Sequence, residues 1–241
     1  MTTSKKINLF RRIIRKIKWV LRKKEMNLPI SSPVHDKRIE NFIRIIDEGY
    51  GNKQSFLTQR SINSMGEPIP WFTYPSIQYL SQLDLHAMSI LEWGIGNSTL
   101  FFANRCEKII SIEHNNDWYN LISKELPDNS KGFLVNESEY ATFPEQLNQK
   151  FDIIIVDGIQ RFECLKTAVN LLQREGMIIF DNSDRNPEYC AFLREQNLIE
   201  IDFHGFGPIV NFTTTTSVFL TRTANFKPLT IQPVIPIGGG Y

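Results

Sequence analysis

Between residues 88 and 196 the sequence alternates short apolar segments with segments of helical periodicity. We expect strands at 88–93, 108–113, 132–136, 151–157 and 176–181. We expect helices at 98–105, 116–125, near 142–149, at 160–173 and at 187–196. Strands that alternate with helices of this length predict right-handed βαβ units and a mostly parallel sheet. The almost continuous apolar run at 151–156 is typical of a strand that is covered on both faces.

The end of this pattern differs from the rest. Strands are expected near 199–204 and 215–222, with no helix between them, so they should pair antiparallel as a hairpin at one edge. The predicted fold class is therefore α/β: a Rossmann-like, doubly wound, mostly parallel sheet of about seven strands with an antiparallel last strand. Helices at 38–49 and 76–84 precede it, so the domain should span 38–223, followed by a flexible tail at 224–241.

The first 25 residues differ in charge from the rest of the chain. Ten of the 27 Lys and Arg residues fall in 1–24, which has no Asp or Glu, so the remainder holds 17 basic against 26 acidic residues. An acidic body disfavours nucleic acid, because phosphate contacts need a basic surface. Apolar residues at three- and four-residue steps predict an amphipathic helix over 5–24, joined to the domain by a linker at 26–37.

This basic arm has two main interpretations. The first is an interfacial helix on an anionic membrane, and the second is a helix that covers the domain or a second subunit, as in a homodimer. A basic arm that contacts RNA is a weaker third alternative. The apolar runs are too short for a membrane span, and charges interrupt every candidate signal-peptide core. Three cysteines without metal-type spacing indicate a reducing compartment, so we expect a cytoplasmic protein, with the inner membrane surface as an alternative.

A glycine turn follows the first expected strand. Glu92 ends the strand, Gly94 and Gly96 follow it, and Ser98 stands near the start of the next helix. Glycines at this spacing let the backbone turn tightly and approach a bulky ligand. Glu113 ends the second strand, 19 residues after Gly94, where an acid can accept hydrogen bonds from a ribose diol. The layout predicts a site for an adenosine-containing ligand.

Over roughly residues 70–222, the layout resembles the class I S-adenosylmethionine-dependent methyltransferases. The resemblance rests on the segment 92–98, Glu113, the segment 151–158 and the segment 176–182, and it is nearest to small-molecule or glycan O-methyltransferases with Val-Asp-Gly-x-x-Arg after the fourth strand. It implies S-adenosylmethionine as cofactor and a small-molecule or glycan acceptor, while protein and lipid-linked acceptors remain open.

The resemblance also implies individual roles. Gly94 and Gly96 would pass beneath the amino-acid part of the cofactor, Glu92 would lie near its ammonium group, and Glu113 would bind the ribose. The remaining cofactor-binding candidates are His114 beside the ribose or adenine, Asn136 near the adenine, and Ser98, which replaces a frequent third glycine.

Two acids end the fourth and fifth strands. Asp157 and Asp181 should point into the crevice where open α/β sheets bind ligands. With Asn182 they supply three oxygen ligands for Mg²⁺ or Ca²⁺, as in the cation-dependent O-methyltransferases that this arrangement resembles. The alternatives are that Asp157 or Asp181 acts as a general base or orients the acceptor, or that these residues are purely structural. Arg161 either binds an anionic acceptor or forms a surface ion pair.

Two other classes of function compete with a methyltransferase. An NAD-dependent oxidoreductase would also place an acid after the second strand, although Glu92 and the final hairpin argue against it. A non-catalytic nucleoside-binding module would keep the fold without transfer. The two strand-end acids argue weakly against such a module.

Overall fold

A computed structural model describes residues 33–239 of the chain. The described residues fall into two units, 33–43 and 44–239. The helices are α2 (Pro33–Arg44), α3 (Asn52–Thr58), α4 (Tyr74–Leu80), α5 (Asn97–Ala103), α6 (Asn116–Ile122), α7 (Arg161–Leu171) and α8 (Pro187–Glu195). Shorter turns are the π-helical η1 (Ile45–Gly49) and the 3-10 turns η2 (Ser123–Glu125), η3 (Phe143–Leu147) and η4 (Ser183–Arg185).

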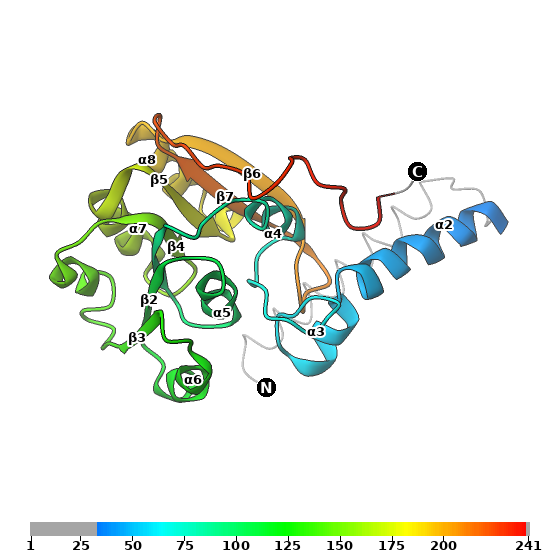
Figure 1. The fold of residues 1–241 in the computed structure, drawn as a ribbon, viewed down its shortest axis with the longest axis horizontal. Helices are drawn as coiled ribbons and strands as arrows, with labels where there is room; N and C mark the ends of the chain where they lie inside the picture. Colours follow the sequence, from blue (N-terminus) through cyan, green and yellow to red (C-terminus); the bar gives the residue numbers. More distant parts are fainter. Residues whose placement is uncertain (1–32, 240–241) are drawn as a thin grey trace, which may run out of the picture. The chain divides into compact units, whose positions relative to one another are not determined.

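The strands are β1 (Ser89–Trp93), β2 (Lys108–Glu113), β3 (Ser130–Leu134), β4 (Phe151–Val156), β5 (Leu172–Asp181), β6 (Ile199–Phe206) and β7 (Thr213–Leu220). They form one seven-stranded sheet in the order β3-β2-β1-β4-β5-β7-β6 (Figure 1). Strands β1 to β5 pair in parallel, whereas β7 runs antiparallel to both β5 and β6. The predicted fold class is confirmed, including the hairpin of the last two strands. The strand order reverses between β1 and β4, where open α/β sheets bind their ligands.

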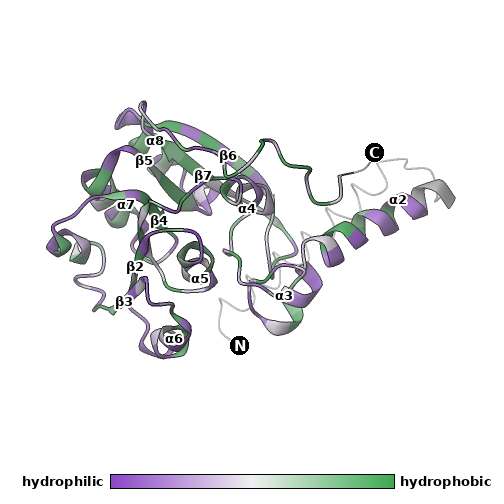
Figure 2. Ribbon diagram, viewed as in Figure 1, coloured by the Kyte–Doolittle hydropathy of each residue, from purple (hydrophilic) through white to green (hydrophobic). Residues whose placement is uncertain are grey.

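Both faces of the sheet are covered, as the apolar strands predict. Successive side chains of a strand point to opposite faces. Ile154 and Val156 of β4 therefore join one apolar cluster with α7 and α8, while Ile153 and Ile155 join a second with α4 and α5. Figure 2 shows hydrophobic residues concentrated in the strands between these layers. Since all four of these side chains are inaccessible to solvent, β4 is the centre of the core.

The termini of the domain differ from the sequence-based expectation. Helix α2 begins at Pro33, so the last residues of the expected linker 26–37 are helical. The expected tail is attached to the domain through hydrogen bonds from the Asp84 backbone N–H to the Lys227 carbonyl and from the Leu229 N–H to the Gln82 carbonyl. The basic helix predicted over 5–24 lies outside the described residues.

Two further observations bear on the predicted environment of the chain. Within residues 33–239, no helix combines the length and the apolar character needed to cross a bilayer. The three cysteines, Cys106, Cys164 and Cys190, are free thiols and are buried.

Candidate active site

The turn after β1 depends on one glycine more than on the other. Gly94 has φ +102°, a backbone conformation that is strained for any residue with a side chain. Its N–H donates to the Ile112 carbonyl of β2 at 2.9 Å. Gly96 is extended, with φ 178°, so any residue could adopt its backbone angles. A Cβ there would meet only Trp118 and Ser98, at 3.9 and 4.0 Å. Gly94 therefore fixes the turn, and the missing side chain of Gly96 leaves space above it.

Glu92 is buried beneath this turn and is held by three hydroxyl groups. Ser98 Oγ donates to its Oε1, while Thr99 Oγ1 and Ser111 Oγ donate to its Oε2 at 2.5 and 2.8 Å. Burial raises the pKa of Glu92 to about 7, although the three hydroxyls partly oppose the shift. The side chain is therefore a fixed, readily protonated acceptor below the ligand cavity.

Glu113 at the end of β2 is also buried, but one of its carboxylate oxygens accepts fewer hydrogen bonds than the other. Oε1 accepts from the backbone N–H groups of His114 and Asn115 at 2.8 and 2.7 Å. Oε2 accepts only a longer bond, 3.3 Å, from the Ile95 N–H. Since a carboxylate oxygen has two lone pairs, Oε2 keeps capacity to accept from a ligand hydroxyl.

These residues line a cavity of about 590 Å³, within the range of small-molecule sites. Five of the predicted cofactor-binding residues meet in its wall: Glu92, Gly94, Gly96, Ser98 and Glu113. Helix α6 adds an aromatic and aliphatic wall that begins with Trp118, whose indole Nε1 donates to the Ile95 carbonyl at 2.5 Å. The sequence pattern thus located most of one ligand cavity.

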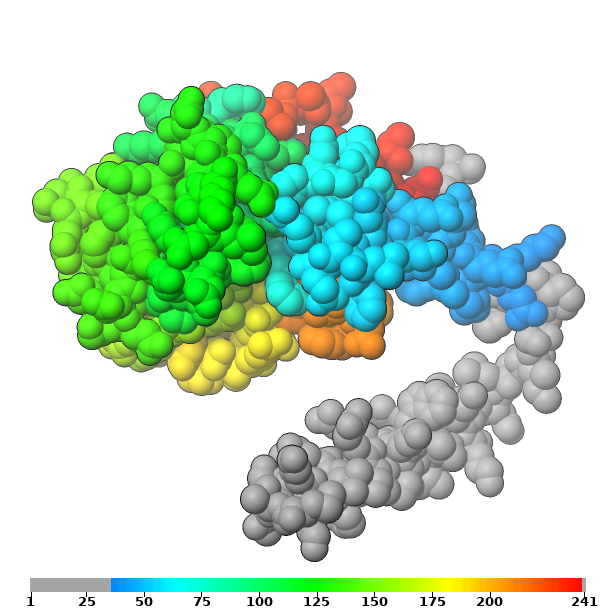
Figure 3. All heavy atoms as spheres, turned by 90° about the horizontal axis from the view of Figure 1, so that it is seen from below, coloured from blue at the N-terminus to red at the C-terminus, as the bar shows by residue number. Residues whose placement is uncertain are grey.

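The segment after α3 closes another side of the same cavity. Arg60 donates to both carboxylate oxygens of Glu125 at 3.2 and 2.7 Å, and also to Asn97 Oδ1 at 3.2 Å. Asn97 Nδ2 in turn donates to the Ser61 carbonyl at 2.6 Å. Figure 3 shows the segment that contains α3, in cyan, against the segment that contains α6, in green. The cavity wall therefore joins parts of the chain that are far apart in sequence.

Two of the predicted cofactor-binding residues lie elsewhere. His114 and Asn136 line a neighbouring cavity of about 310 Å³ together with Glu139 and Phe143. His114 Nδ1 lies 3.0 Å from Glu113 Oε1, and its ring meets Tyr140 edge-on with centroids 5.5 Å apart. His114 is thus in contact with Glu113 of the larger cavity, although neither His114 nor Asn136 lines that cavity.

A second cavity, of about 350 Å³, contains the strand-end acids. Asp157, Arg161, Asp181 and Asn182 line it, so all four residues predicted for catalysis or metal binding converge. Asp157 and Trp71 also line the 590 Å³ cavity. The two cavities therefore share a boundary at the Asp157 carboxylate.

Arg161 joins the ends of β4 and β5. Its Nε donates to the Gly158 carbonyl at 3.0 Å, Nη1 to the Asp181 carbonyl at 2.5 Å, and Nη2 to the Asp157 carbonyl at 2.9 Å. Nη2 also lies 3.0 Å from Asp157 Oδ1. Most donors of the guanidinium group are thus used within the protein, so Arg161 positions the strand ends and the Asp157 carboxylate.

The acids have raised pKa values for a shared reason. Burial raises the pKa of Asp157, and the charges of Arg161 and Arg185 partly oppose the shift. Burial, followed by the negative charge of Asp157, raises the pKa of Asp181 well above its ordinary value. Asp181 Oδ1 accepts from Thr216 Oγ1 and its Oδ2 from Asn182 Nδ2, each at 2.6 Å.

These contacts do not fit the predicted magnesium or calcium site. Both carboxylate oxygens of Asp181 face donors, and the guanidinium of Arg161 faces Asp157 Oδ1 and, at 3.4 Å, Asn182 Oδ1. A cationic side chain thus occupies the side toward which the oxygens point. Among residues 33–239, no three His, Cys, Asp or Glu side chains form a group suited to a metal ion. The arrangement instead suits an acid–base or orienting role.

The sequence reasoning missed other lining residues. Arg60 and Ser61 gave no local signal, because their place depends on contacts with α5 and η2. Trp118 could have been found, because Asn115 is a typical N-cap residue and places Trp118 in the first turn of α6 beside Glu113. Gly207, which follows β6, also lines the smaller cavity.

No family model and no curated protein sequence matches the chain. Solved structures do match. Precorrin-6y C5,15-methyltransferase from Geobacter metallireducens is 16% identical, with a TM-score of 0.49 over 63% of this chain and 90% of that one. An rRNA methylase from Streptococcus thermophilus is 15% identical, with a TM-score of 0.48 over 61% and 97%. The N-methyltransferase NodS from Bradyrhizobium japonicum, in complex with S-adenosyl-L-homocysteine, is 13% identical, with a TM-score of 0.45 over 80% and 89%.

All three of these proteins are named as methyltransferases or methylases, the class that the glycine turn and strand-end acids resemble. The seven strands with an antiparallel β7 match the architecture that this resemblance implies. The observed fold is the Rossmann-like α/β architecture with an antiparallel β7. The similarities are distant and the names of these proteins point to different acceptors, so the activity of this chain has to be argued from its own site.

Proposed function

We propose that the protein is an S-adenosylmethionine-dependent methyltransferase that methylates a hydroxyl group of a small-molecule or glycan acceptor. The observation that carries this proposal is the meeting of two cavities at Asp157. One has the size that a nucleoside requires and an acid, Glu113, that can accept from a ribose, and the other is smaller and contains both strand-end acids. Transfer between two bound molecules needs such a pair of adjoining sites.

The residues of the larger cavity fit the proposed donor. Glu113 Oε2 is available to ribose hydroxyls, and the space above Gly96 admits the amino-acid portion. Trp118 and Leu121 offer apolar surface to the rest of the molecule. The bound donor would supply a methyl carbon attached to a positively charged sulfur.

Asp157 has the position and acidity of a general base. Asp157 lines both cavities, Arg161 holds one of its carboxylate oxygens, and burial raises its pKa to about 6. With the donor bound, the acceptor oxygen would take up the methyl group as it loses its proton, and the electron pair of the broken carbon–sulfur bond would stay with the donor. Asp157 takes the hydroxyl proton and later releases it to water.

The sheet supports this proposal over an NAD-dependent oxidoreductase. Dinucleotide-binding sheets have the order 3-2-1-4-5-6, with two mononucleotide-binding halves. Here β7 is inserted antiparallel between β5 and β6, so the second half differs from that pattern. Only the first half keeps the glycine turn and ribose acid.

The test combines binding with turnover. S-adenosylhomocysteine should bind the wild-type protein in calorimetry, whereas NAD should not. Glu113→Ala should weaken that binding, because it removes the ribose acceptor. Asp157→Asn should leave binding nearly unchanged but lower methyl transfer by about 100-fold, in the range of general-base catalysis.

The acceptor screen should include sugars, phenols and lipid-linked sugars, with and without chelator. Binding of NAD in place of S-adenosylhomocysteine would overturn the proposal. Donor binding without transfer to any acceptor class would favour the non-catalytic module.

A further inference from the structure

The smaller cavity is lined in part by an exposed cationic side chain, Arg185. Arg185 ends η4 and lines this cavity, and its side chain forms no hydrogen bond or ion pair within the described part of the chain. The neighbouring Asp184 turns to β7 instead, where its Oδ1 accepts from Thr214 Oγ1 and from the Thr215 N–H at 2.8 and 2.9 Å. Arg161, by contrast, is saturated by carbonyl and carboxylate oxygens.

The other charged groups of this cavity have partners of their own. Asp157 Oδ1 lies 3.0 Å from the Arg161 guanidinium. Asp181 is buried, and its two carboxylate oxygens accept from Thr216 Oγ1 and Asn182 Nδ2. Arg185 is therefore the cationic group of this lining that remains available to a ligand, although the chain after residue 24 is acidic overall.

Two aromatic side chains complete the lining. Trp71 and Phe212 line the cavity and are each 51% exposed, so they present flat apolar surface to whatever binds there. Exposed aromatic rings of this kind favour contact with a ring-shaped ligand face. The cavity volume of about 350 Å³ is at the small end for ligand sites. The lining suits a molecule of monosaccharide size.

On the basis of the proposed function, we propose that the acceptor is a sugar-sized molecule with an anionic group, a carboxylate or a phosphate, which Arg185 binds. A guanidinium group suits both anions, because its parallel N–H donors can bind two oxygens at once. The acceptor ring would lie on the exposed aromatic side chains, with a hydroxyl at Asp157. Arg185 would then select the acceptor without taking part in the proton transfer.

The test compares anionic with neutral sugars on the protein with S-adenosylhomocysteine already bound. Calorimetry with D-glucuronate, glucose 6-phosphate and D-glucose, and with the matching galactose series, separates carboxylate, phosphate and neutral ligands. We expect an anionic sugar to bind at least about 10-fold more tightly than its neutral counterpart, as a charged hydrogen bond provides. Arg185→Gln should abolish this preference, and Arg185→Lys should restore part of it.

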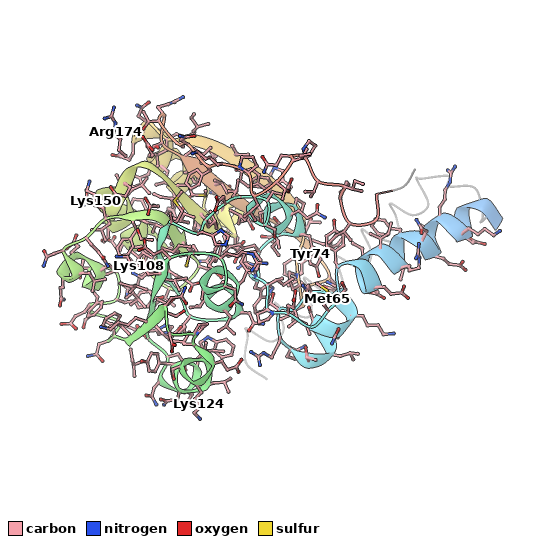
Figure 4. All side chains as sticks on the ribbon, in the orientation of Figure 1. Met65, Tyr74, Lys108, Lys124, Lys150 and Arg174 are labelled. Carbon is pink, nitrogen blue, oxygen red and sulfur yellow. The ribbon has the colours of Figure 1, made fainter. Side chains whose placement is uncertain are left out.

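Arg174→Gln is the matched control. Arg174 is exposed near the start of β5, whereas Asp181 of the smaller cavity is the last residue of that strand. Figure 4 labels Arg174 at the outer side of the domain. This variant should keep the full preference for anionic sugars. With radiolabelled methyl donor at pH 8, where Asp157 is ionised, Arg185→Gln should raise KM for the anionic sugar about 10- to 100-fold and leave kcat nearly unchanged.

Three results would overturn the inference while the proposed function stands: donor binding with equal affinity for anionic and neutral sugars, no binding of any anionic sugar, or an anionic preference that survives in Arg185→Gln. Failure of the wild-type protein to bind S-adenosylhomocysteine would instead overturn the proposed function, and this inference with it.

Discussion

At the scale of single residues, Gly158 shows how the residue type at a motif position can depend on a neighbour that is remote in sequence but close in space. A Cβ at this position would lie 2.0 Å from the hydroxyl oxygen of Tyr140. Tyr140 is fully buried, and within residues 33–239 its hydroxyl has no hydrogen-bond partner. Close packing against the Tyr140 side chain thus requires glycine here, directly after Asp157 at the end of β4.

We therefore expect Gly158→Ala to reduce the free energy of unfolding by about 1–3 kcal/mol, as overpacking does. Tyr140→Phe alone should be nearly neutral, because the hydroxyl it removes is unpaired. In the double variant part of the loss should be recovered, since the nearest remaining atom, Tyr140 Cζ, lies 3.0 Å from the added Cβ. Urea unfolding of the three variants measures this coupling, and strictly additive effects would contradict it.

The acidity of Asp157 makes a second prediction at this scale. A general base must be ionised, and burial raises the pKa of Asp157 to about 6. The value of kcat/KM should therefore rise with pH through about 6 and level off above it. Arg161→Ala should move this limb to higher pH, because the cation that favours the ionised carboxylate is lost. A pH–rate profile without an acid limb would argue against Asp157 as the base.

At the scale of elements, the sequence predicted which segments are strands better than where they end. The strand expected at 132–136 is β3, Ser130–Leu134, because its register is set by pairing with β2, where Ile109 faces Ser130. The helix expected near 142–149 is the short 3-10 turn η3, with a proline in its first turn. Helix α3 was not predicted within the Gly- and Pro-rich segment 50–75.

The same distinction applies to the site. Glu92, Gly94 and Glu113 were predictable because a strand, a tight turn and a following strand place them by local geometry. Arg60 was not, because its position depends on Glu125, 65 residues further along. The contacts that disfavour the metal alternative were not predictable for a related reason, since the sequence could not show that the Arg161 side chain lies against the oxygens of Asp157 and Asn182.

The N-terminus of α6 offers a test of how one element supports the larger cavity. Asn115 Oδ1 accepts from the Trp118 N–H at 2.9 Å and so caps the helix. Asn115→Ala should lower the free energy of unfolding by about 1 kcal/mol and weaken S-adenosylhomocysteine binding, because Trp118 loses its anchor. Asn115→Asp keeps a capping oxygen and serves as the control. Thermal unfolding and calorimetry together measure both effects, and equal loss in the two variants would contradict a capping role.

At the scale of the whole molecule, the buried acids make stability depend on pH. Burial raises the pKa of Glu92 to about 7 from an ordinary value of 4.5, and Asp157 and Asp181 shift in the same direction. The folded state then holds more protons than the unfolded state between these pKa values. Stability contributed by the protonated acids is present at low pH and is lost as pH rises through the folded pKa.

We expect the free energy of unfolding to fall between pH 5 and pH 8. Glu92→Gln should flatten this dependence and be more stable than the wild type at pH 8, on the order of 1–3 kcal/mol. Urea titrations of both proteins at several pH values measure the difference. Glu175→Gln, at an exposed position of β5, is the control and should leave the slope unchanged. A wild-type stability that rises over this interval would contradict the buried, proton-binding state of Glu92.

The contact between Arg60 and Glu125 has a consequence for kinetics. Both side chains are partly exposed, at 44% and 39%, so dissolved ions can screen their attraction. This ion pair closes one wall of the larger cavity. Salt should therefore weaken that wall without altering the sheet or the glycine turn. A molecule seated behind it would have a residence time that shortens as ionic strength rises, and the speed of product release would follow the salt concentration.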